Sequence, residues 1–448
     1  MSAKAFEVVV IGAGMAGLGA TRKAASAGRR VAIVDTRPYG GTCALRGCDP
    51  KKVLVGAAEV VDWARRMKGY GVAGEARIDW SELMAFKRTF TQPVPQRLEH
   101  GLEGLGVATL HGSARFTGPD SLKVGEDELT AERFLVAVGA EPRALGIPGE
   151  ELLATSTEFL DLERLPGRVL FVGGGYVSFE LAHVAARAGA SVTIVHRGER
   201  PLEAFDPDLV QQLVAASEEA GIRVLTATEV TGVARRAGGL AARTRSGEEL
   251  EADLVVHGAG RVPEFAALDL ERGGVAFDAA RGVRVNEHLQ SVSNPRVYAA
   301  GDAADTTGAK LTPVAVHEGL TAASNLLDGN RKTPDYRGTP SVVFTLPALA
   351  RAGLSEAEAR AQGLDFDVNG GDSSDWYTSR RTREPHAGYK VLLEKGSGRI
   401  LGAHLLGMNA GETIDIFALA IRHDLTARDL KTSILVHPAA ASDVTYML

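Results

Sequence analysis

The fold is decided by the stretch FEVVVIGAGMAG, residues 6–17. Its apolar half predicts a buried strand, which a helical run to Gly28 and a second strand at residues 30–34 follow. The turn between strand and helix has the G-x-G-x-x-G spacing of a nucleotide-binding βαβ unit, with Gly12, Gly14 and Gly17. Such a turn lets the backbone approach a pyrophosphate, whose charge the N–H groups of the helix N-terminus meet. Asp35, after the second strand, is expected to accept hydrogen bonds from ribose hydroxyls.

A second copy of this pattern begins with RVLFVGGGYVS, residues 168–178, and ends with a strand at residues 191–195. Gly173 and Gly175 lie in its turn. The segment VHRGER, residues 195–200, places no carboxylate at the ribose position and instead offers Arg197 and Arg200. Because guanidinium groups favour a 2′-phosphate, the second unit is predicted to bind NADPH rather than NADH.

The chain has two cysteines, and both lie in the loop GGTCALRGCDPKK, residues 40–52. Because this loop follows the first dinucleotide unit, we expect Cys43 and Cys48 to form a redox-active pair beside a redox cofactor. A helix that begins in the loop would lower the pKa of a thiol. Arg46 adds positive charge between the cysteines. It lowers a thiol pKa, raises the potential of a disulfide or points to solvent, and these alternatives stay open.

The composition is that of a soluble globular protein, with 45% apolar residues, 24% charged residues and a net charge of −6. A length of 448 residues predicts about three domains. The chain has no basic block, which argues against nucleic acid or a membrane surface as the principal partner. The absence of a signal segment and of a long apolar stretch predicts a cytoplasmic protein. Since ordinary thiols stay reduced there, the cysteine pair is redox-active, metal-binding or coincidental; we predict a redox pair and no metal site.

These motifs, in this order, resemble the class I pyridine nucleotide-disulfide oxidoreductases, and the resemblance covers essentially the whole chain. Gly12, Gly14, Gly17 and Asp35 match the FAD fingerprint of that family, and Gly41, Thr42, Cys43, Cys48 and Lys51 match its redox-disulfide signature. VGAEP at 138–142 and GAGRVP at 258–263 resemble its A-T-G-x-x-P turns, with Gly139 and Gly260. Gly301 and Asp302 match its second FAD motif, and residues 311–315 match the segment beneath the flavin. The resemblance therefore implies FAD and NADPH as cofactors.

The resemblance also implies residue roles. Cys48 would contact the flavin, and Cys43 would attack a substrate disulfide. Lys51 and Glu180 match a pair beside the flavin N5, and Tyr176 matches a tyrosine that covers the flavin until nicotinamide displaces it. His437, followed by Pro438, matches an acid-base histidine supplied by the other subunit, so the resemblance implies a homodimer.

The group that supports His437 departs from the family pattern. A glutamate is expected five residues after the histidine, where this chain has Ser442, and the carboxylate comes one residue later as Asp443. A shift of one residue on a helix turns a side chain by about 100°. Whether Asp443 reaches the imidazole therefore stays open.

The fold class expected is α/β, with two Rossmann-like dinucleotide-binding domains, for FAD and NADPH, and a C-terminal α+β dimerisation domain. The boundaries expected are 1–150 for the FAD domain, 151–265 for the NAD(P)H domain, 266–334 for a central segment that completes the FAD domain, and 335–448 for the dimerisation domain. In the last domain, residues 341–345, 388–394 and 400–406 predict strands of an antiparallel sheet. Residues 355–362 and 412–423 predict helices.

The function predicted is an NADPH-dependent flavoprotein disulfide reductase that acts on a small-molecule disulfide. Three alternatives remain. Dihydrolipoamide dehydrogenase would be indicated by a preference for NADH together with lipoamide turnover. A metal-ion or quinone reductase would turn over copper, mercury or a quinone but no disulfide. A redox sensor would be reduced by NADPH without repeated turnover.

Overall fold

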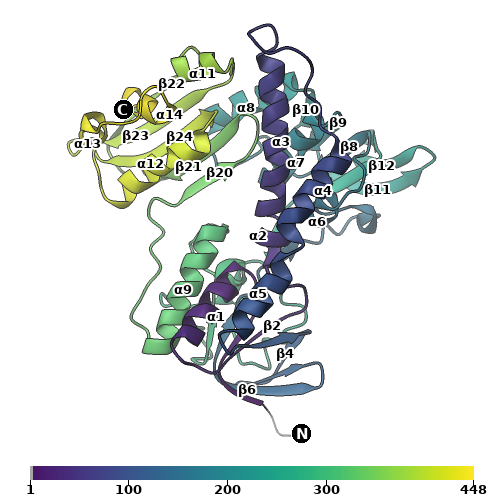
Figure 1. Cartoon of the computed structure of the whole chain (residues 1–448), viewed down its shortest axis with the longest axis vertical. Helices are drawn as coiled ribbons and strands as arrows, with labels where there is room; N and C mark the ends of the chain where they lie inside the picture. The colour runs from purple at the N-terminus through teal and green to yellow at the C-terminus, as the bar shows by residue number, and fades with distance from the viewer. Residues whose placement is uncertain (1–3) are drawn as a thin grey trace. The chain divides into compact units, whose positions relative to one another are not determined.

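The computed structural model describes residues 4–448 and divides into two compact units. Unit 1 consists of Met1–Pro50, Phe86–Arg143 and Arg261–Tyr336, and unit 2 of Lys51–Ala85, Ala144–Gly260 and Arg337–Leu448. The chain therefore passes repeatedly between the units, as the colour sequence in Figure 1 shows. The four-domain boundaries expected from the sequence stay a prediction.

Unit 1 is built on a seven-stranded sheet in the order β3-β2-β1-β6-β5-β4, with β18 paired to β6. Its parallel strands are β1 (Lys4–Ile11), β2 (Val31–Asp35), β3 (Ala108–His111), β6 (Asp127–Val136) and β18 (Val297–Ala299). The hairpin of β4 (Ala114–Gly118) and β5 (Ser121–Val124) continues the sheet in antiparallel pairing. The βαβ unit predicted at residues 6–35 is thus confirmed.

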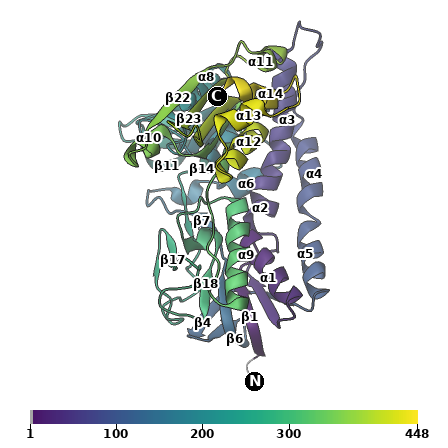
Figure 2. The same cartoon turned by 90° about the vertical axis from the view of Figure 1, so that its left-hand side faces the viewer.

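Helices α1 (Met15–Ser26) and α9 (Thr312–Asp328) lie side by side in unit 1 (Figures 1 and 2). They share a core with strand residues such as Val8, Val10 and Ile33. The helices touch through small residues: a Cβ at Gly319 would lie 2.4 Å from the carbonyl oxygen of Ala16. The apolar strands are buried on both faces because a second core fills the other side of the sheet.

Unit 2 contains the second βαβ unit. Its four-stranded parallel sheet has the order β10-β9-β8-β14, with β8 (Arg168–Val172), β9 (Ser191–Val195), β10 (Ile222–Leu225) and β14 (Leu254–His257). Helices α7 (Tyr176–Arg187) and α8 (Pro207–Glu219) pack against it, and β11 (Val230–Arg236), β12 (Gly239–Thr244) and β13 (Glu249–Ala252) form a separate antiparallel sheet. Both predicted strands and the helix between them are found.

The C-terminal part of unit 2 holds a five-stranded antiparallel sheet in the order β20-β21-β24-β23-β22. Its strands are β20 (Pro340–Val343), β21 (Ala348–Gly353), β22 (Phe366–Asp372), β23 (Gly388–Glu394) and β24 (Ile400–Gly407). Helix α10 (Glu356–Ala361) follows β21, and α12 (Ala410–Arg422) packs on β21 and β24. The three predicted strands and two predicted helices are confirmed, whereas β21 and β22 were not predicted.

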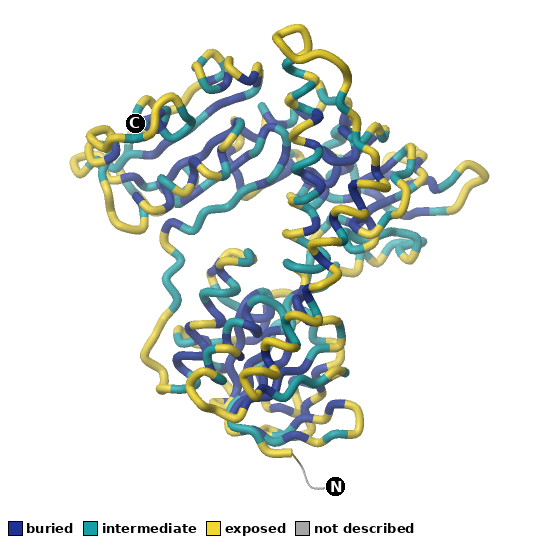
Figure 3. The backbone as a smooth tube through the Cα atoms, in the orientation of Figure 1, coloured by how far each residue is buried: buried dark blue, intermediate teal, exposed yellow. Residues whose placement is uncertain are grey.

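Figure 3 shows that buried residues follow the strands of the sheets and the inner sides of their helices. The fold class expected from the sequence is therefore correct. Among the helices within residues 4–448, none combines the length and the apolar character that a transmembrane span requires.

Candidate functional site

The first dinucleotide turn closes tightly in unit 1. The N–H of Gly12 donates to the carbonyl of Val34 at 2.8 Å, and φ of Gly12 is +109°. A Cβ at this position would lie 2.3 Å from the carbonyl oxygen of Ala137, so only glycine fits. Asp35 accepts a hydrogen bond from the N–H of Ala13 at Oδ2, 2.7 Å away. The carboxylate is therefore fixed at the open end of the turn.

The residues of this turn fit the diphosphate of FAD. Helix α1 begins after Gly14, and no side chain caps its N-terminus. The N–H groups of its first turn therefore remain available to an anion. A Cβ on Gly41 would lie 2.6 Å from Cα of Gly14, and the N–H of Gly40 donates to the carbonyl of Ala13 at 3.0 Å. These contacts seat the start of the cysteine loop directly on the turn.

The two cysteines lie on consecutive helices. Cys43 is in α2 (Gly41–Arg46) and is half-buried, while Cys48 is exposed and begins α3 (Cys48–Arg66). Both are thiols. A hydrogen bond with Cys48 raises the pKa of the Cys43 thiol, and burial adds to the rise. The lowered thiol pKa expected from the helix is therefore not found at Cys43, because the neighbouring sulfur and burial outweigh the helix.

The segment predicted to run beneath the flavin lies beside this pair. Sγ of Cys48 is 3.3 Å from Oγ1 of Thr312, the first residue of α9. Sγ of Cys43 donates to the carboxylate of Asp49 at 3.8 Å. A hydrogen bond with Thr312 also lowers the pKa of Cys43, so Thr312 lies beside both sulfurs.

Arg46 is half-buried and does not project freely into solvent. Burial lowers its pKa, and so does the charge of Arg37, whereas the charges of Asp35 and Glu264 raise it. These are residues at the Asp35 end of the dinucleotide turn. Arg46 therefore lies within the electrostatic influence of the residues around Asp35.

The second FAD motif is a short 3₁₀ turn, η2 (Gly301–Ala303). Burial raises the pKa of Asp302, and the nearby charge of Lys310 partly opposes this effect. Lys310 also donates to the carbonyls of Gly301 and Ala304, at 3.4 and 2.5 Å. The turn that carries Asp302 is thereby held from its carbonyl side.

Glu318, on α9, holds the turn η2 by accepting a hydrogen bond from a backbone N–H of that turn. This residue was not predicted from the sequence. Its carboxylate accepts hydrogen bonds from the N–H of Gly301 (2.7 Å), the hydroxyl of Thr306 (2.8 Å) and the hydroxyl of Tyr336 (2.6 Å). The residue is 1% exposed. A lone glutamate in a helix is ordinarily a surface residue, and only the flanking buried positions Thr321, Ala322 and Ala323 place it on the inner face.

The second dinucleotide turn, in unit 2, repeats the first. The N–H of Gly173 donates to the carbonyl of Val195 at 2.8 Å, and α7 begins after Gly175 without a side-chain cap. These features fit the diphosphate of NADPH. Tyr176 is the first residue of α7 and is exposed.

The two predicted phosphate ligands in the loop after β9 have different surroundings. Arg197 is exposed. The guanidinium of Arg200 instead donates to the carbonyls of Glu203 (3.0 Å) and Phe205 (3.2 Å). His196 accepts a hydrogen bond from the N–H of Gly174 at Nδ1, 3.1 Å away, and the sequence did not single it out. The motif predicts a function for a carboxylate at this position but none for an imidazole, so the pattern gave no signal for His196.

Lys51 and Glu180 form a buried ion pair in unit 2. Nζ of Lys51 is 2.8 Å from Oε1 of Glu180, and the side chains are 14% and 2% exposed. Oε1 also accepts the N–H of Phe344 at 2.9 Å, and Nζ of Lys51 lies 4.6 Å from the centroid of the Phe344 ring. The ammonium group is therefore held by a carboxylate and an aromatic face together.

His437 is exposed and makes no hydrogen bond within residues 4–448. The hydroxyl of Thr378 donates to Oδ2 of Asp443. The hydroxyl of Ser442 donates to the carbonyl of Ala439 at 2.7 Å. Within the subunit, therefore, neither Ser442 nor Asp443 orients the imidazole through a hydrogen bond.

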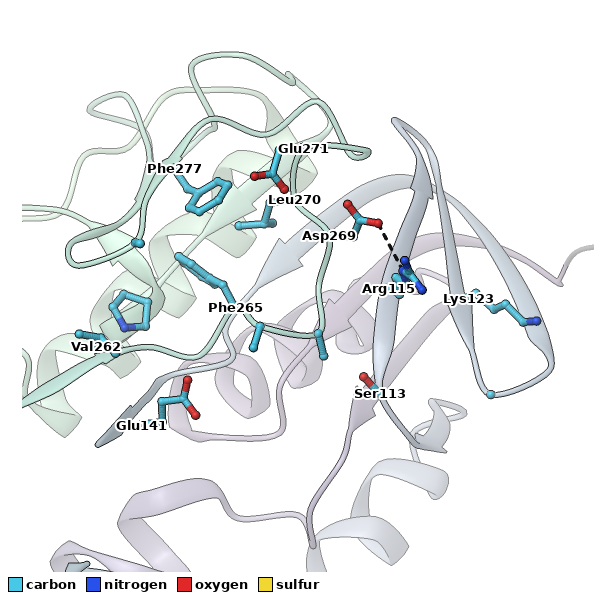
Figure 4. A pocket seen from close by; sticks show the side chains of 15 residues that line it. Ser113, Arg115, Lys123, Glu141, Val262, Phe265, Asp269, Leu270, Glu271 and Phe277 are labelled. Atoms are coloured by element: carbon cyan, nitrogen blue, oxygen red, sulfur yellow. Dashed lines mark hydrogen bonds and ion pairs between the residues drawn. The ribbon is translucent and has the colours of Figure 1, made fainter. Parts of the chain in front are cut away.

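A separate pocket of about 1020 Å³ lies in unit 1 (Figure 4). It is bordered by the β4–β5 hairpin and by the segment 262–279, which contributes Phe265, Leu270 and Phe277. The ion pair of Arg115 with Asp269, 3.3 Å between N and O, joins its two walls. None of the residues predicted to bind a cofactor lines this pocket.

Among residues 4–448, no group of three or more His, Cys, Asp or Glu side chains is arranged to hold a metal ion.

Comparison with known families finds two matches along the chain. Residues 6–319 match the model of the pyridine nucleotide-disulphide oxidoreductases, and residues 339–448 match the dimerisation domain of the same family. The matched segments cover nearly the whole length.

Curated relatives have similar lengths. A glutathione reductase of Burkholderia cepacia is 32% identical over 439 residues, which cover 98% of this chain and 97% of the relative. A dihydrolipoyl dehydrogenase of Thermus scotoductus is 33% identical over 442 residues, covering 97% and 95%. A mercuric reductase of Staphylococcus aureus is 31% identical over 435 residues, covering 96% and 79%.

Among solved structures, the Cu(II) complex of the HOCl-induced flavoprotein disulfide reductase RclA from Escherichia coli superimposes with a TM-score of 0.89. Its sequence is 26% identical, and the superposition covers 100% of this chain and 99% of that one.

Proposed function

The chain belongs to the pyridine nucleotide-disulphide oxidoreductase family, and from this premise we propose that it reduces a small-molecule disulfide through Cys43 and Cys48. It is a flavoprotein disulfide reductase that uses FAD and NADPH. The observation that carries the proposal is the packing of the loop with both cysteines on the first dinucleotide turn, where Cys48 lies close enough to Cys43 to raise its pKa.

The electron path follows from the chemistry of these groups. Bound FAD would supply two-electron transfer from NADPH to the disulfide of Cys43 and Cys48. The thiolate of Cys43 then attacks one sulfur of the substrate disulfide, forms a mixed disulfide and releases the first product thiol. Cys48 attacks Cys43, which releases the second product thiol and restores the enzyme disulfide. One NADPH and one proton are consumed for each disulfide that becomes two thiols.

The proton for the first leaving thiolate would come from His437 of the other subunit in a homodimer. The match of residues 339–448 to a dimerisation domain supports such a dimer. The exposure of His437, together with that of Ile434 and Val436 in the same segment, suits a partner contact. Histidine is the side chain whose ordinary pKa allows this proton transfer near neutral pH.

Three other groups complete the proposal. The pair of Lys51 and Glu180 would stabilise negative charge at the flavin N5, because a buried ammonium is a strong local positive charge. Tyr176 would cover the nicotinamide position. Arg197 would bind the 2′-phosphate of NADPH, since its guanidinium is exposed, whereas that of Arg200 already contacts two carbonyls.

We also expect the enzyme to act in the cytoplasm, where NADPH is available.

Anaerobic titration with NADPH tests the electron path, and a panel of disulfides that includes oxidised glutathione tests the substrate class. We expect a long-wavelength absorbance, which a thiolate beside an oxidised flavin gives, after the first two electrons, and turnover of one disulfide. Cys43→Ser should abolish disulfide turnover and leave FAD content and NADPH oxidation by ferricyanide intact. Cys48→Ser, the matched control, should also abolish the long-wavelength absorbance. Disulfide turnover retained by Cys43→Ser would refute the assignment.

Reduction of a metal ion is a second candidate function. It is favoured by the lack of a hydrogen bond to His437, since such reduction needs no acid for a leaving thiolate. The similarity to RclA, which was solved as a Cu(II) complex, points the same way. Turnover of Cu(II) with NADPH, but of no disulfide in the panel, would select this function.

A further inference from the structure

A carboxylate lies beside the sulfur that is proposed to attack the substrate. Asp49 is the second residue of α3, and its Oδ1 accepts a hydrogen bond from Sγ of Cys43 at 3.8 Å. Both residues belong to unit 1, so this contact lies within one compact unit. Asp49 is exposed, while Cys43 is half-buried. A molecule that reaches the sulfur therefore comes close to this carboxylate.

The charge of Asp49 is not neutralised by an ion pair among residues 4–448. Two lysines follow it in the sequence, but each is paired with another carboxylate. Nζ of Lys51 lies 2.8 Å from Glu180. Nζ of Lys52 lies 3.1 Å from Glu59. The carboxylate of Asp49 thus keeps its negative charge beside the sulfur.

Between the two cysteines the loop contains one cation, Arg46, and this residue is half-buried. The carboxylates of Asp35 and Glu264 raise the pKa of Arg46 and therefore balance part of its charge. The charge of Asp49, by contrast, acts on Cys43 itself, where it adds to the rise in pKa that Cys48 and burial cause. The exposed charge at the attacking sulfur is therefore negative.

Attack on a disulfide requires Cys43 as a thiolate, which no longer donates a hydrogen bond to Asp49. The thiolate and the carboxylate are then two neighbouring negative charges. A cationic group on the incoming molecule is attracted by both, and an anionic group is repelled by both. At a partly exposed site, one unit charge about 6 Å away changes a rate at least roughly threefold.

We infer that Asp49 selects by charge, so that Cys43 reacts with cationic and neutral disulfides in preference to anionic ones. This inference rests on the proposed function and specifies its substrate class. Oxidised glutathione, in which carboxylates outnumber ammonium groups, is then a poor substrate, whereas a disulfide with amines near its sulfurs is a good one. The exchange reaction itself is unchanged: Cys43 forms a bond to one sulfur, and the other sulfur leaves as a thiolate.

Charged methanethiosulfonates test the selection without any catalytic turnover. These reagents add to a thiolate by the same kind of exchange, and three of them are compared: one with a sulfonate, one with a trimethylammonium group and one without charge. In Cys48→Ala, Cys43 is the one cysteine left in the chain, so mass spectrometry of the labelled protein reports on Cys43 alone. The neutral reagent corrects for changes in the general reactivity of the sulfur.

Asp49→Asn, made in this background, keeps the shape of the side chain and removes its charge. The ratio of the second-order rate constants for the cationic and the anionic reagent should fall at least roughly fivefold at low ionic strength. Asp49→Glu, the matched control, keeps the charge and should retain most of the ratio. Added salt should reduce the ratio more in the protein with Asp49 than in Asp49→Asn, because salt screens exposed charges. A structural role at the start of α3 would not depend on the charge of the reagent.

Turnover with NADPH, in the enzyme with both cysteines, then tests the substrate class. Cystamine, hydroxyethyl disulfide and dithiodipropionate are small disulfides that are cationic, neutral and anionic. The ratio of kcat/KM for cystamine to that for dithiodipropionate should fall in Asp49→Asn by a similar factor. Circular dichroism and FAD content establish that each variant is folded, and Asp49→Ser replaces Asp49→Asn if the latter does not fold.

Two outcomes would overturn the inference. One is a reagent ratio that is the same with and without the charge of Asp49. The other is a shifted reagent ratio with an unchanged turnover ratio, because another group would then set the preference for the substrate. If none of the disulfides is turned over, the proposed function fails, while the reagent ratio still decides whether Asp49 selects by charge at Cys43.

Discussion

The backbone N–H of Gly301 donates a hydrogen bond to Oε2 of Glu318 at 2.7 Å, across a gap of sixteen residues between the turn η2 and the body of α9. The other oxygen of the carboxylate accepts two hydroxyl groups, those of Thr306 and Tyr336. Because Asp302 follows Gly301 directly, Glu318 fixes the turn that would place Asp302 against the cofactor.

We predict that Glu318→Ala weakens FAD binding at least tenfold and lowers the free energy of unfolding by about 2–4 kcal/mol, because one buried and two half-buried donors lose their acceptor. Fluorescence of released FAD and denaturant unfolding measure the two effects. Tyr336→Phe removes one donor without orphaning the carboxylate, so it should weaken FAD binding much less. FAD affinity that falls equally in both variants would contradict the role given to the bond with Gly301.

A pH-dependent reactivity is expected at Cys43. Its pKa is raised, first by the hydrogen bond with Cys48 and then by burial. A raised pKa keeps the group as a thiol at neutral pH, so alkylation by iodoacetamide in the NADPH-reduced enzyme should increase as pH rises beyond about 8.5, the ordinary pKa of cysteine. Mass spectrometry of the labelled peptide gives the rate.

The variant Cys48→Ala isolates the cause. It removes the hydrogen-bonding sulfur and should lower the pKa of Cys43, so that Cys43 is labelled faster at neutral pH than in the wild-type enzyme. An unchanged labelling rate in Cys48→Ala would mean that burial, rather than Cys48, governs this thiol.

The two βαβ units could be predicted because each is encoded locally, by an apolar strand, a glycine turn and a helix in sequence. Strands β21 and β22 could not. The sequence of β21, ALARAG, consists largely of alanine and glycine, and that of β22, FDVNGGD, of residues that disfavour strands. Both are strands because they pair with neighbours far away in sequence, β21 with β20 and β24 and β22 with β23. Such pairing overrides local preference.

The same limit applies to the candidate site. Cys43, Cys48, Lys51 and Glu180 were predicted through motifs, and the structure joins Lys51 to Glu180 by an ion pair. Glu318 and His196 belong to no motif that was recognised. Their importance lies in which backbone N–H each one accepts, and that relation exists only after the chain has folded.

The buried pair of Lys51 and Glu180 leads to a prediction about flavin reduction. Lys51→Met should slow reduction of the flavin by NADPH at least tenfold, because the positive charge is lost while the length of the side chain is kept. It should also lower the free energy of unfolding by about 3–5 kcal/mol, since Glu180 would remain buried without its partner. Stopped-flow absorbance and denaturant unfolding measure the two quantities.

The double variant Lys51→Met, Glu180→Gln separates these effects. Removal of both charges should restore much of the stability but none of the rate of flavin reduction. Recovery of the rate together with stability would show that the pair is structural and has no electrostatic role in the reaction.

The bond from Thr378 to Asp443 predicts a stability difference that depends on pH. Burial raises the pKa of Asp443, and the hydrogen bond from Thr378 partly opposes the rise. Thr378→Val removes a donor to a charged carboxylate and should destabilise the protein at neutral pH by about 1.5–3 kcal/mol. In Thr378→Val the pKa of Asp443 in the folded state therefore moves further above its value in the unfolded state. Compared with the wild-type protein, the variant is then most stable at low pH and loses stability as pH rises through the folded-state pKa. Denaturant unfolding at several pH values should show the variant approaching the wild-type protein as Asp443 becomes protonated.

Ser442→Ala is the matched control, because it loses the hydroxyl that bonds to Ala439. This loss should lower the free energy of unfolding by about 1 kcal/mol. The decrease should be equal at every pH, because neither Ser442 nor Ala439 titrates. A constant difference for Thr378→Val would mean that Asp443 is not charged when it accepts the bond from Thr378.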